Sequence, residues 1–266
     1  MLRRELPLSE YDIISRLLEE LEAGKRAVLI TLIHKQGSGP RETGSKMLIT
    51  SEGLTLGTIG GGGMERILVK EALEALNKGR PRVIEFALGI QPREGMIPVE
   101  SKCGGEVRIF IDVIKPTPRI IIMGSGVIAQ AVARYANDCG FRIIVFDDSE
   151  TARPEVFPFA KVMNDPYPAS LKELDIKPSD YVLMLHGETD FELHGLRYAV
   201  KANPYFIGLL GSNNKSREHK KQLLDEGYPA DVVEKIVGPV GLDIGAETPE
   251  EIGISIVAQL INIRRS

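Results

Sequence analysis

The stretch RIIIMGSGVIAQAVARYA, residues 119–136, decides the fold of the second half of the chain. Its first five residues are typical of a buried strand, and Gly124, Gly126 and Ala129 follow in a G-x-G-x-x-A pattern that opens a helix. The first glycine permits a tight turn, the second lets a pyrophosphate approach the backbone, and the small third residue lets helix and strand pack closely. The stretch therefore predicts a Rossmann-like domain.

The sequence after this stretch keeps the same alternation of strands and helices. Apolar runs resembling strands alternate with helical segments near 127–138, 191–201 and 215–226; the runs are 142–146, 181–185 and 205–210. A capping box of Thr248 and Glu251, with Pro249 between them, opens the last helix. This rhythm is typical of βαβ units and predicts a parallel sheet.

Asp147 ends the second predicted strand of this domain, next to Asp148, and lies 23 positions after Gly124. An acid at about this offset binds a ribose hydroxyl in dinucleotide-binding domains. Gly124, Gly126 and Asp147 are therefore candidates for binding NAD(P). The alternative is a Rossmann-like domain that keeps the turn for packing and binds no dinucleotide.

Two further positions lie where predicted strands end. His186 follows the run 181–185, at the edge where open α/β sheets gather ligands, so it is either a proton donor or a capped polar end. Gly208, Gly211 and Ser212 lead into a helix that carries Lys215 and other cations. That pattern indicates either an anion site or a glycine turn before a solvated helix.

The first half of the chain has a different character. A helix is expected from about Ser9 to Ala23 and another over 64–79, with a loop over 89–102; strands are expected at 26–34, 46–50, 54–59, 81–88 and 106–114. This half is α+β. The segment KPTP, residues 115–118, is the predicted boundary because two prolines favour an extended connector, giving domains 1–116 and 117–266.

Glycine-rich segments of the first half are candidates for holding an anion. The loop KQGSGPRETGSKM presents Arg41 after Pro40, close to Ser38 and several glycines. The segment GTIGGGGME, 57–65, ends a strand and starts a helix at Gly60, Gly61, Gly62 and Glu65, and its amides suit a phosphate or another oxygen-rich group. No lysine followed by serine or threonine comes after these glycines, which argues against a P-loop.

Cys103 precedes Gly104 and Gly105 at the start of a predicted strand. A cysteine flanked by glycines is less crowded than a core cysteine, and nearby Lys102 favours its thiolate. The alternative is an inert buried thiol, which suits Cys139 better. With only these two cysteines, the chain has no disulfide framework and no four-cysteine metal site.

Composition excludes some classes of partner. The net charge of −4 gives no electrostatic reason to expect nucleic acid or an anionic membrane. No run approaches the roughly 18 apolar residues of a membrane span. We expect a cytoplasmic protein.

The motifs together resemble the XdhC/CoxI family of accessory proteins of xanthine dehydrogenase and carbon monoxide dehydrogenase. The resemblance covers nearly the whole chain and rests on GSGPRETGSKM, GTIGGGGME, CGGEVRIFID, GSGVIAQA, FIGLLGSNNK and GLDIGAETPEEI. It departs at Gly63, where many relatives have cysteine or alanine, and at Lys102, where xanthine dehydrogenase accessories often have a second cysteine. Leu185 stands where threonine is frequent before the histidine.

The resemblance implies a maturation factor that binds the molybdenum cofactor (molybdopterin), assists its sulfuration and inserts it into a molybdenum hydroxylase apoenzyme. A cysteine desulfurase is a further partner implied. A homodimer is expected because a partner often completes the interdomain cleft of a two-domain protein. Cys103 is then the metal-facing and sulfur-handling residue, with His186 as a second catalytic candidate. The residues carried over as cofactor-binding are Ser38, Arg41, Gly60, Gly61, Gly62, Glu65, Gly104, Gly105, Gly124, Gly126, Asp147, Gly211 and Ser212.

Two other classes of function stay open. An NAD(P)-dependent oxidoreductase is indicated by the Gly124 motif and Asp147. A scaffold that recruits a desulfurase or an apoenzyme without a small ligand is the third hypothesis. Whether the chain turns over a substrate is open, and a binding chaperone is favoured over an enzyme.

Overall fold

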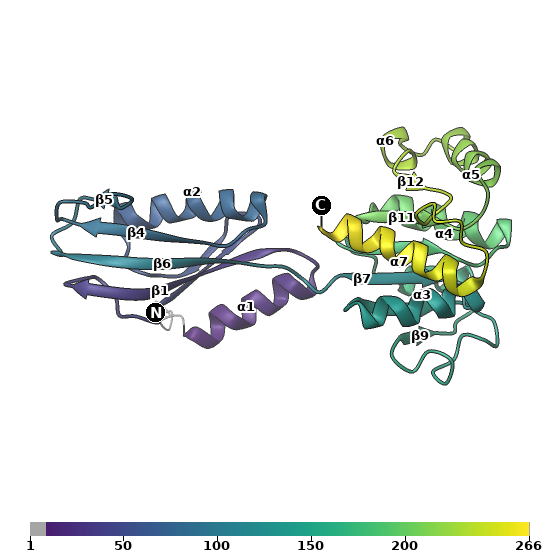
Figure 1. Ribbon diagram of the computed structural model, residues 1–266, viewed down its shortest axis with the longest axis horizontal. Helices are drawn as coiled ribbons and strands as arrows, with labels where there is room; N and C mark the ends of the chain where they lie inside the picture. The colour runs from purple at the N-terminus through teal and green to yellow at the C-terminus, as the bar shows by residue number, and fades with distance from the viewer. Residues whose placement is uncertain (1–8, 266) are drawn as a thin grey trace, which may run out of the picture. The chain divides into compact units, whose positions relative to one another are not determined.

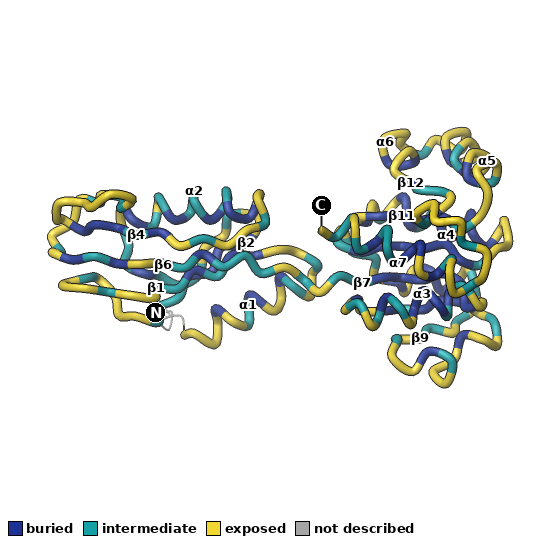
Figure 2. Tube along the Cα trace, viewed as in Figure 1, coloured by how far each residue is buried: buried dark blue, intermediate teal, exposed yellow. Residues whose placement is uncertain are grey.

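The computed structural model describes residues 9–265, which form two compact units that divide between Pro116 and Thr117 (Figure 1). Each unit contains a six-stranded sheet of its own. In both units the strands are mostly buried and the connecting loops are mostly exposed (Figure 2). The functional features therefore have to be sought within each unit, at the loops that end its strands.

The first unit is α+β, as predicted. Its elements are α1 (Glu10–Glu22), β1 (Ala27–Gly37), β2 (Lys46–Thr50), β3 (Thr55–Gly57), α2 (Gly62–Lys78), β4 (Arg82–Leu88), β5 (Ile97–Val99) and β6 (Gly105–Ile114). The strand order is β3-β2-β1-β6-β4-β5, and all neighbours are antiparallel except β4 and β5. A short parallel strand, β5, thus lies inside the segment expected to be a loop. Three residues are too few for a periodic pattern to reveal it.

Alternation along β1 places one helix on each face of this sheet. Val28, Ile30 and Leu32 point to the core that α2 covers, whereas Ala27 packs with Ile13 of α1. Period-two alternation requires neighbouring side chains to point to opposite faces, so one strand contributes to both cores.

The second unit is a doubly wound parallel sheet. Its elements are β7 (Arg119–Met123), α3 (Val127–Asp138), β8 (Arg142–Phe146), β9 (Lys161–Met163), the 3₁₀ helix η1 (Ala169–Glu173), β10 (Tyr181–Met184), α4 (Thr189–Ala202), β11 (Phe206–Leu209), α5 (Asn213–Asp225), α6 (Ala230–Val233), β12 (Ile236–Val237) and α7 (Pro249–Arg265). The strand order is β12-β11-β10-β7-β8-β9, with every pair parallel. Numbered within the unit, this is the Rossmann order 3-2-1-4-5-6, so the predicted fold is confirmed.

Helices cover both faces of the second sheet. On one face Ile120 and Ile122 pack with α3 and α7, and on the other Ile121 and Met123 pack with α4 and α5. Because these strands are buried on both sides, their sequence is continuously apolar and does not alternate. The capping box of α7 is present, since the Glu251 amide donates to the Thr248 hydroxyl at 3.2 Å and the Thr248 amide to the Glu251 carboxylate at 3.0 Å.

Candidate functional site

The antiparallel order of the first sheet gathers three glycine-bearing loops at one end. Gly37, the last residue of β1, is paired with Gly105, the first residue of β6. Next to this pair the Ser38 amide donates to the Gly104 carbonyl at 3.3 Å. Gly60 lies against Pro40, so closely that an added Cβ would come within 2.6 Å of the proline ring. The loop that carries Arg41 therefore contacts both the tetraglycine segment and the loop that carries Cys103.

Glu65 orders the tetraglycine segment from within. Its carboxylate accepts hydrogen bonds from the Thr58 hydroxyl at 2.5 Å, the Gly61 amide at 2.9 Å and the Ile59 amide at 3.2 Å. Burial alone raises the pKa of Glu65, but these hydrogen bonds and one from Gly60 outweigh it, so the pKa lies below its ordinary value. The carboxylate already engages amides that an incoming anion would use.

Other parts of these loops are open. Gly62 and Gly104 have free space where a side chain would stand, and Gly62 has a φ of +66°, which favours glycine. Within residues 9–265 no side-chain hydrogen bond caps the first turn of α2. Ser38 and Arg41 are exposed. A phosphate or another oxygen-rich group thus has exposed amides and a guanidinium within one loop cluster.

Cys103 is the thiol of this cluster. It is half-buried, packs on the core under α2, and its amide donates to the Ser101 hydroxyl at 3.1 Å. Its carbonyl lies close to Gly89, where a Cβ would come within 2.7 Å of it. Across residues 9–265, no three His, Cys, Asp or Glu side chains form a group that would hold a metal ion. A metal bound here would have one protein thiol and would have to bring its remaining ligands.

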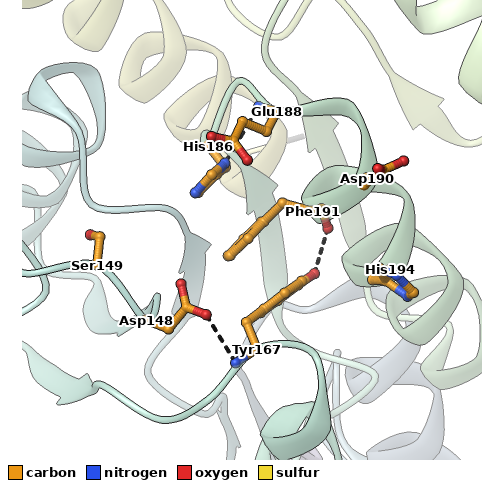
Figure 3. Close-up of a pocket in the computed structure, with 8 residues that line it drawn as sticks. All are labelled: Asp148, Ser149, Tyr167, His186, Glu188, Asp190, Phe191 and His194. Atoms are coloured by element: carbon orange, nitrogen blue, oxygen red, sulfur yellow. Dashed lines mark hydrogen bonds between the residues drawn. The ribbon is translucent and has the colours of Figure 1, made fainter.

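The second unit holds a pocket of about 380 Å³ where β8 and β10 end. It is lined by Asp148, Ser149, Tyr167, His186, Glu188, Asp190, Phe191 and His194 (Figure 3). The carboxyl edge of a parallel sheet is where ligands bind in open α/β folds. The volume falls within the roughly 300–1,000 Å³ of small-molecule sites.

Three stacked rings form a wall of this pocket. The His186 ring stacks on Phe191 with centroids 3.7 Å apart, and Phe191 stacks on Tyr167 at 3.5 Å. The Tyr167 hydroxyl donates to the Phe191 carbonyl at 2.5 Å, and Figure 3 draws this bond. Burial raises the pKa of Tyr167, so the phenol stays neutral and keeps donating. His186, singled out in the sequence, is therefore part of an ordered aromatic wall.

Asp147 lies beneath the pocket and is 2% exposed. Its carboxylate accepts hydrogen bonds from the Ser125 hydroxyl at 2.5 Å and the Ser149 hydroxyl at 3.1 Å, and Thr151 completes the hydroxyl cluster. His186 Nε2 is 3.8 Å from the other carboxylate oxygen. Asp147 thus has partners within the chain in the place where a ribose hydroxyl would be bound. Asp148, its neighbour, is exposed and lines the pocket.

Gly124 sits where the strand order reverses, between β7 and β10. Its φ is +119°, and an added Cβ would come within 2.7 Å of the His186 amide nitrogen. Gly126, by contrast, has open space around it. The first glycine of the motif is accordingly required by packing on the His186 loop, whereas the second leaves its backbone free for a ligand.

A buried ion-pair network holds the His186 loop from behind. Glu192 is fully buried and accepts from the Gly187 amide at 3.0 Å; its other oxygen is 2.6 Å from Lys215 Nζ and 3.3 Å from His219 Nε2. Lys215 also donates to the Gly187 carbonyl at 2.9 Å. Both sides of the Gly187 peptide are thus held. Lys215, a cation of the anion site considered after Gly211, is turned inward to Glu192. The Ser212 hydroxyl caps α5 by accepting from the Lys215 amide.

Sequence reasoning identified only part of these sites. In the structure the loops that carry Ser38, Arg41, Gly60, Cys103 and Gly104 contact one another. The sequence did not reveal the ring partners of His186 or the buried Glu192. The five-residue spacing between His186 and Phe191 matches no known motif, so the sequence does not pair them. Tyr167 follows β9, a strand too short to predict, so its place near the pocket could not be expected either. The only sequence feature that marks Glu192 is that it is a single acid among the apolar residues of one helix face.

Comparison with known proteins assigns the chain to a family. Residues 20–87 match the XdhC and CoxI family model, and residues 120–260, more than half of the chain, match the XdhC Rossmann domain. The chain belongs to the XdhC/CoxI family. The resemblance of the motifs in the sequence is thereby confirmed.

The relatives extend over most of the chain. Protein YqeB of Escherichia coli (strain K12) is 34% identical over 88% of it, and a probable xanthine dehydrogenase subunit of Bacillus subtilis (strain 168) is 34% identical over 59%. The chain spans only 43% and 46% of their lengths. The molybdenum cofactor insertion chaperone PaoD of E. coli (strain K12) is 24% identical over 93% of the chain and 86% of its own length.

Solved structures share the fold. The crystal structure of a xanthine dehydrogenase from Bacillus halodurans superposes with a TM-score of 0.52 at 23% identity, over 94% of this chain and 95% of that one. This likeness supports the fold of two units described above. Separately, none of the helices in residues 9–265 is both long and apolar enough to cross a membrane.

Proposed function

We propose that this XdhC/CoxI protein is a maturation factor for a molybdenum hydroxylase, which binds the molybdenum cofactor and assists its sulfuration and insertion. The observation that supports the proposal is the loop cluster of the first unit, whose contacting loops carry Arg41, glycines with open space around them and Cys103. The insertion chaperone PaoD, which aligns with 93% of the chain, supports the same role.

The chemistry of the cluster suits this cargo. Molybdopterin carries a phosphate, which the Arg41 guanidinium and the amides at Gly62 and Gly104 would bind. It also carries molybdenum held by soft dithiolene sulfurs, and a cysteine thiolate is a soft ligand of the same kind. Cys103 would then lie near the molybdenum or near the sulfur that is transferred. A molybdenum hydroxylase apoenzyme and a cysteine desulfurase are the partners that this role requires, and a homodimer is proposed with them.

The proposal is tested by isolating the full chain anaerobically from a host that makes the cofactor. We expect about one molybdenum and one pterin per chain. Arg41→Ala should lower the bound cofactor about tenfold or more, because a charge-assisted hydrogen bond to phosphate is lost. Cys103→Ser should lower the molybdenum content while it leaves the phosphate contacts intact.

Matched variants control for nonspecific effects. Arg80→Ala removes an exposed arginine elsewhere in the first unit, and Cys139→Ser alters the other half-buried cysteine. Both should retain wild-type cofactor content. Wild-type content in Arg41→Ala and Cys103→Ser as well would overturn the assignment of the site.

The Rossmann strand order favours a second candidate, an NAD(P)-dependent oxidoreductase. Its test is a titration with NADH followed by the fluorescence of the nicotinamide. A saturable response that Gly126→Val abolishes would support it. No response at millimolar NADH would retire it, in agreement with the internal hydrogen bonds of Asp147.

A further inference from the structure

The pocket of the second unit has a composition that selects among ligands. Asp148, Glu188 and Asp190 supply three carboxylates, and none of the eight described residues that line it is a lysine or an arginine. The nearby cations are engaged elsewhere: Lys215 with Glu192, and Arg197 with Glu226 at 2.7 Å. A phosphate is therefore disfavoured here. A ligand that presents N–H donors is favoured, because ionised carboxylates only accept hydrogen bonds.

The ring wall adds a second, independent selection. Phe191 is stacked between His186 and Tyr167, so the outer faces of His186 and Tyr167 are the ring faces left for a ligand, and Figure 3 shows Asp148 beside Tyr167 and Glu188 beside His186. Flat heterocycles stack on such rings. Rings and carboxylates together suit a flat ring with donors along its edge.

We propose that this pocket binds a heterocycle whose edge carries a ring N–H beside an amino group, as in guanine and in pterins. Two parallel donors of this kind match a carboxylate in the same way that a guanidinium does. Asp148 is the proposed acceptor, because the Tyr167 amide donates to its Oδ2 at 3.1 Å and so holds the carboxylate beside the ring stack. The proposal that a heterocycle binds here rests on the pocket alone. The proposal that this heterocycle is a pterin rests also on the proposed function.

The support behind the pocket is rigid enough for selective binding. The Gly187 peptide, next to His186, is held by Glu192 on its N–H side and by Lys215 on its carbonyl side. The Glu188 amide donates to His186 Nδ1 at 3.4 Å, and His186 Nε2 lies 3.8 Å from Asp147, so both ring nitrogens face groups of the same chain. The ring wall is thus oriented before a ligand arrives, which lowers the entropic cost of binding.

The test is calorimetric titration of the full chain with four probes: guanosine, 6-hydroxymethylpterin, adenosine and an arginine amide. Guanosine or the pterin should bind at least tenfold more tightly than adenosine, which lacks the donor edge, and than the arginine amide, which lacks the fused ring. The tighter of the first two identifies the source of the ring. Equal binding of all four probes, or no binding of guanosine and the pterin at millimolar concentration, would overturn the proposal.

Variants locate the site. Asp148→Asn keeps an oxygen for the Tyr167 amide but loses the charge, and should weaken binding of the preferred probe roughly tenfold or more. Glu173→Gln, an exposed acid outside the pocket, should bind as the wild type does. Equal effects of the two would refute the role of Asp148. If molybdenum cofactor co-purifies but neither guanosine nor the pterin binds, the heterocycle site is refuted and the proposed function stands. If guanosine or the pterin binds but no molybdenum co-purifies, the proposed function is refuted and the heterocycle site stands.

Discussion

The loop cluster of the first unit and the pocket of the second unit are built from different parts of the chain. In the loop cluster the backbone is prominent: glycine amides surround a few exposed side chains, Ser38 and Arg41 among them. In the pocket the side chains are prominent: three rings and three carboxylates line it, and the buried carboxylates of Asp147 and Glu192 lie behind them. The stability of a backbone site should tolerate the loss of its exposed side chains, whereas the stability of a side-chain site should depend on its buried supports.

Removal of a buried support should have the largest effect. Glu192→Ala leaves Lys215 and His219 without their carboxylate in the interior, and should lower the free energy of unfolding by about 3–5 kcal/mol. The chain has no tryptophan, and six of its seven tyrosines lie in the second unit, so tyrosine fluorescence during guanidinium denaturation reports on that unit. Glu218→Ala, an exposed acid on α5, should stay within about 0.5 kcal/mol of the wild type. Equal losses would mean that the network is dispensable.

The next largest difference should lie between substitutions of the two glycines of the Rossmann turn, measured as the loss of stability on replacement by alanine. Gly124→Ala combines a left-handed φ with a backbone clash at the His186 amide, and should cost about 2–4 kcal/mol in the same assay. Gly126→Ala has open space and a φ of −67°, so we expect a loss below about 1 kcal/mol. A larger loss at Gly126 would contradict the packing role assigned to Gly124.

Glu65 tests how far the loop cluster depends on a side chain. Its pKa is lowered in the folded state, so the stability it contributes is present above its ordinary pKa of 4.5 and is lost as the pH falls below that value. Glu65→Gln should destabilise the 58–61 segment at pH 7 by roughly 1 kcal/mol, reduced by solvent screening, and its difference from the wild type should shrink at pH 3. Amide hydrogen exchange of this segment, compared with the wild type at each pH, measures the difference.

A matched acid controls this measurement. Glu94→Gln, at an exposed position of the first unit, should leave exchange of the 58–61 segment unchanged at both pH values. A difference between Glu65→Gln and the wild type that persists unchanged at pH 3 would show that the carboxylate charge is not what orders the loop.

Arg41→Ala should have the smallest effect on stability. The side chain is exposed, so the free energy of unfolding should change by less than about 0.5 kcal/mol even though cofactor binding falls. Amide hydrogen exchange of the first unit within the full chain measures it. A loss above about 1 kcal/mol would indicate that Arg41 supports the fold, and would blur the contrast between the two sites.

Local signals were enough to predict most of the fold. The G-x-G-x-x-A turn, the continuously apolar strands and the Thr248–Glu251 capping box each act over a few residues, and each predicted its element correctly. Three very short strands, β5, β9 and β12, were missed because two or three residues are too few for a periodic pattern.

The sites depended on contacts that no local pattern encodes. Glycine spacing and the cysteine were enough to select Arg41, Gly60 and Cys103 as candidates in the first unit. Tertiary structure alone decided that Glu65 engages the amides beside them, that Asp147 is buried among hydroxyls, and that Lys215 turns inward to Glu192. The physical reason is that a carboxylate takes its partners from whatever the fold brings within hydrogen-bond distance. Ser125 and Lys215 reach Asp147 and Glu192 from distant parts of the chain, whereas Glu65 is bonded by the segment that precedes it.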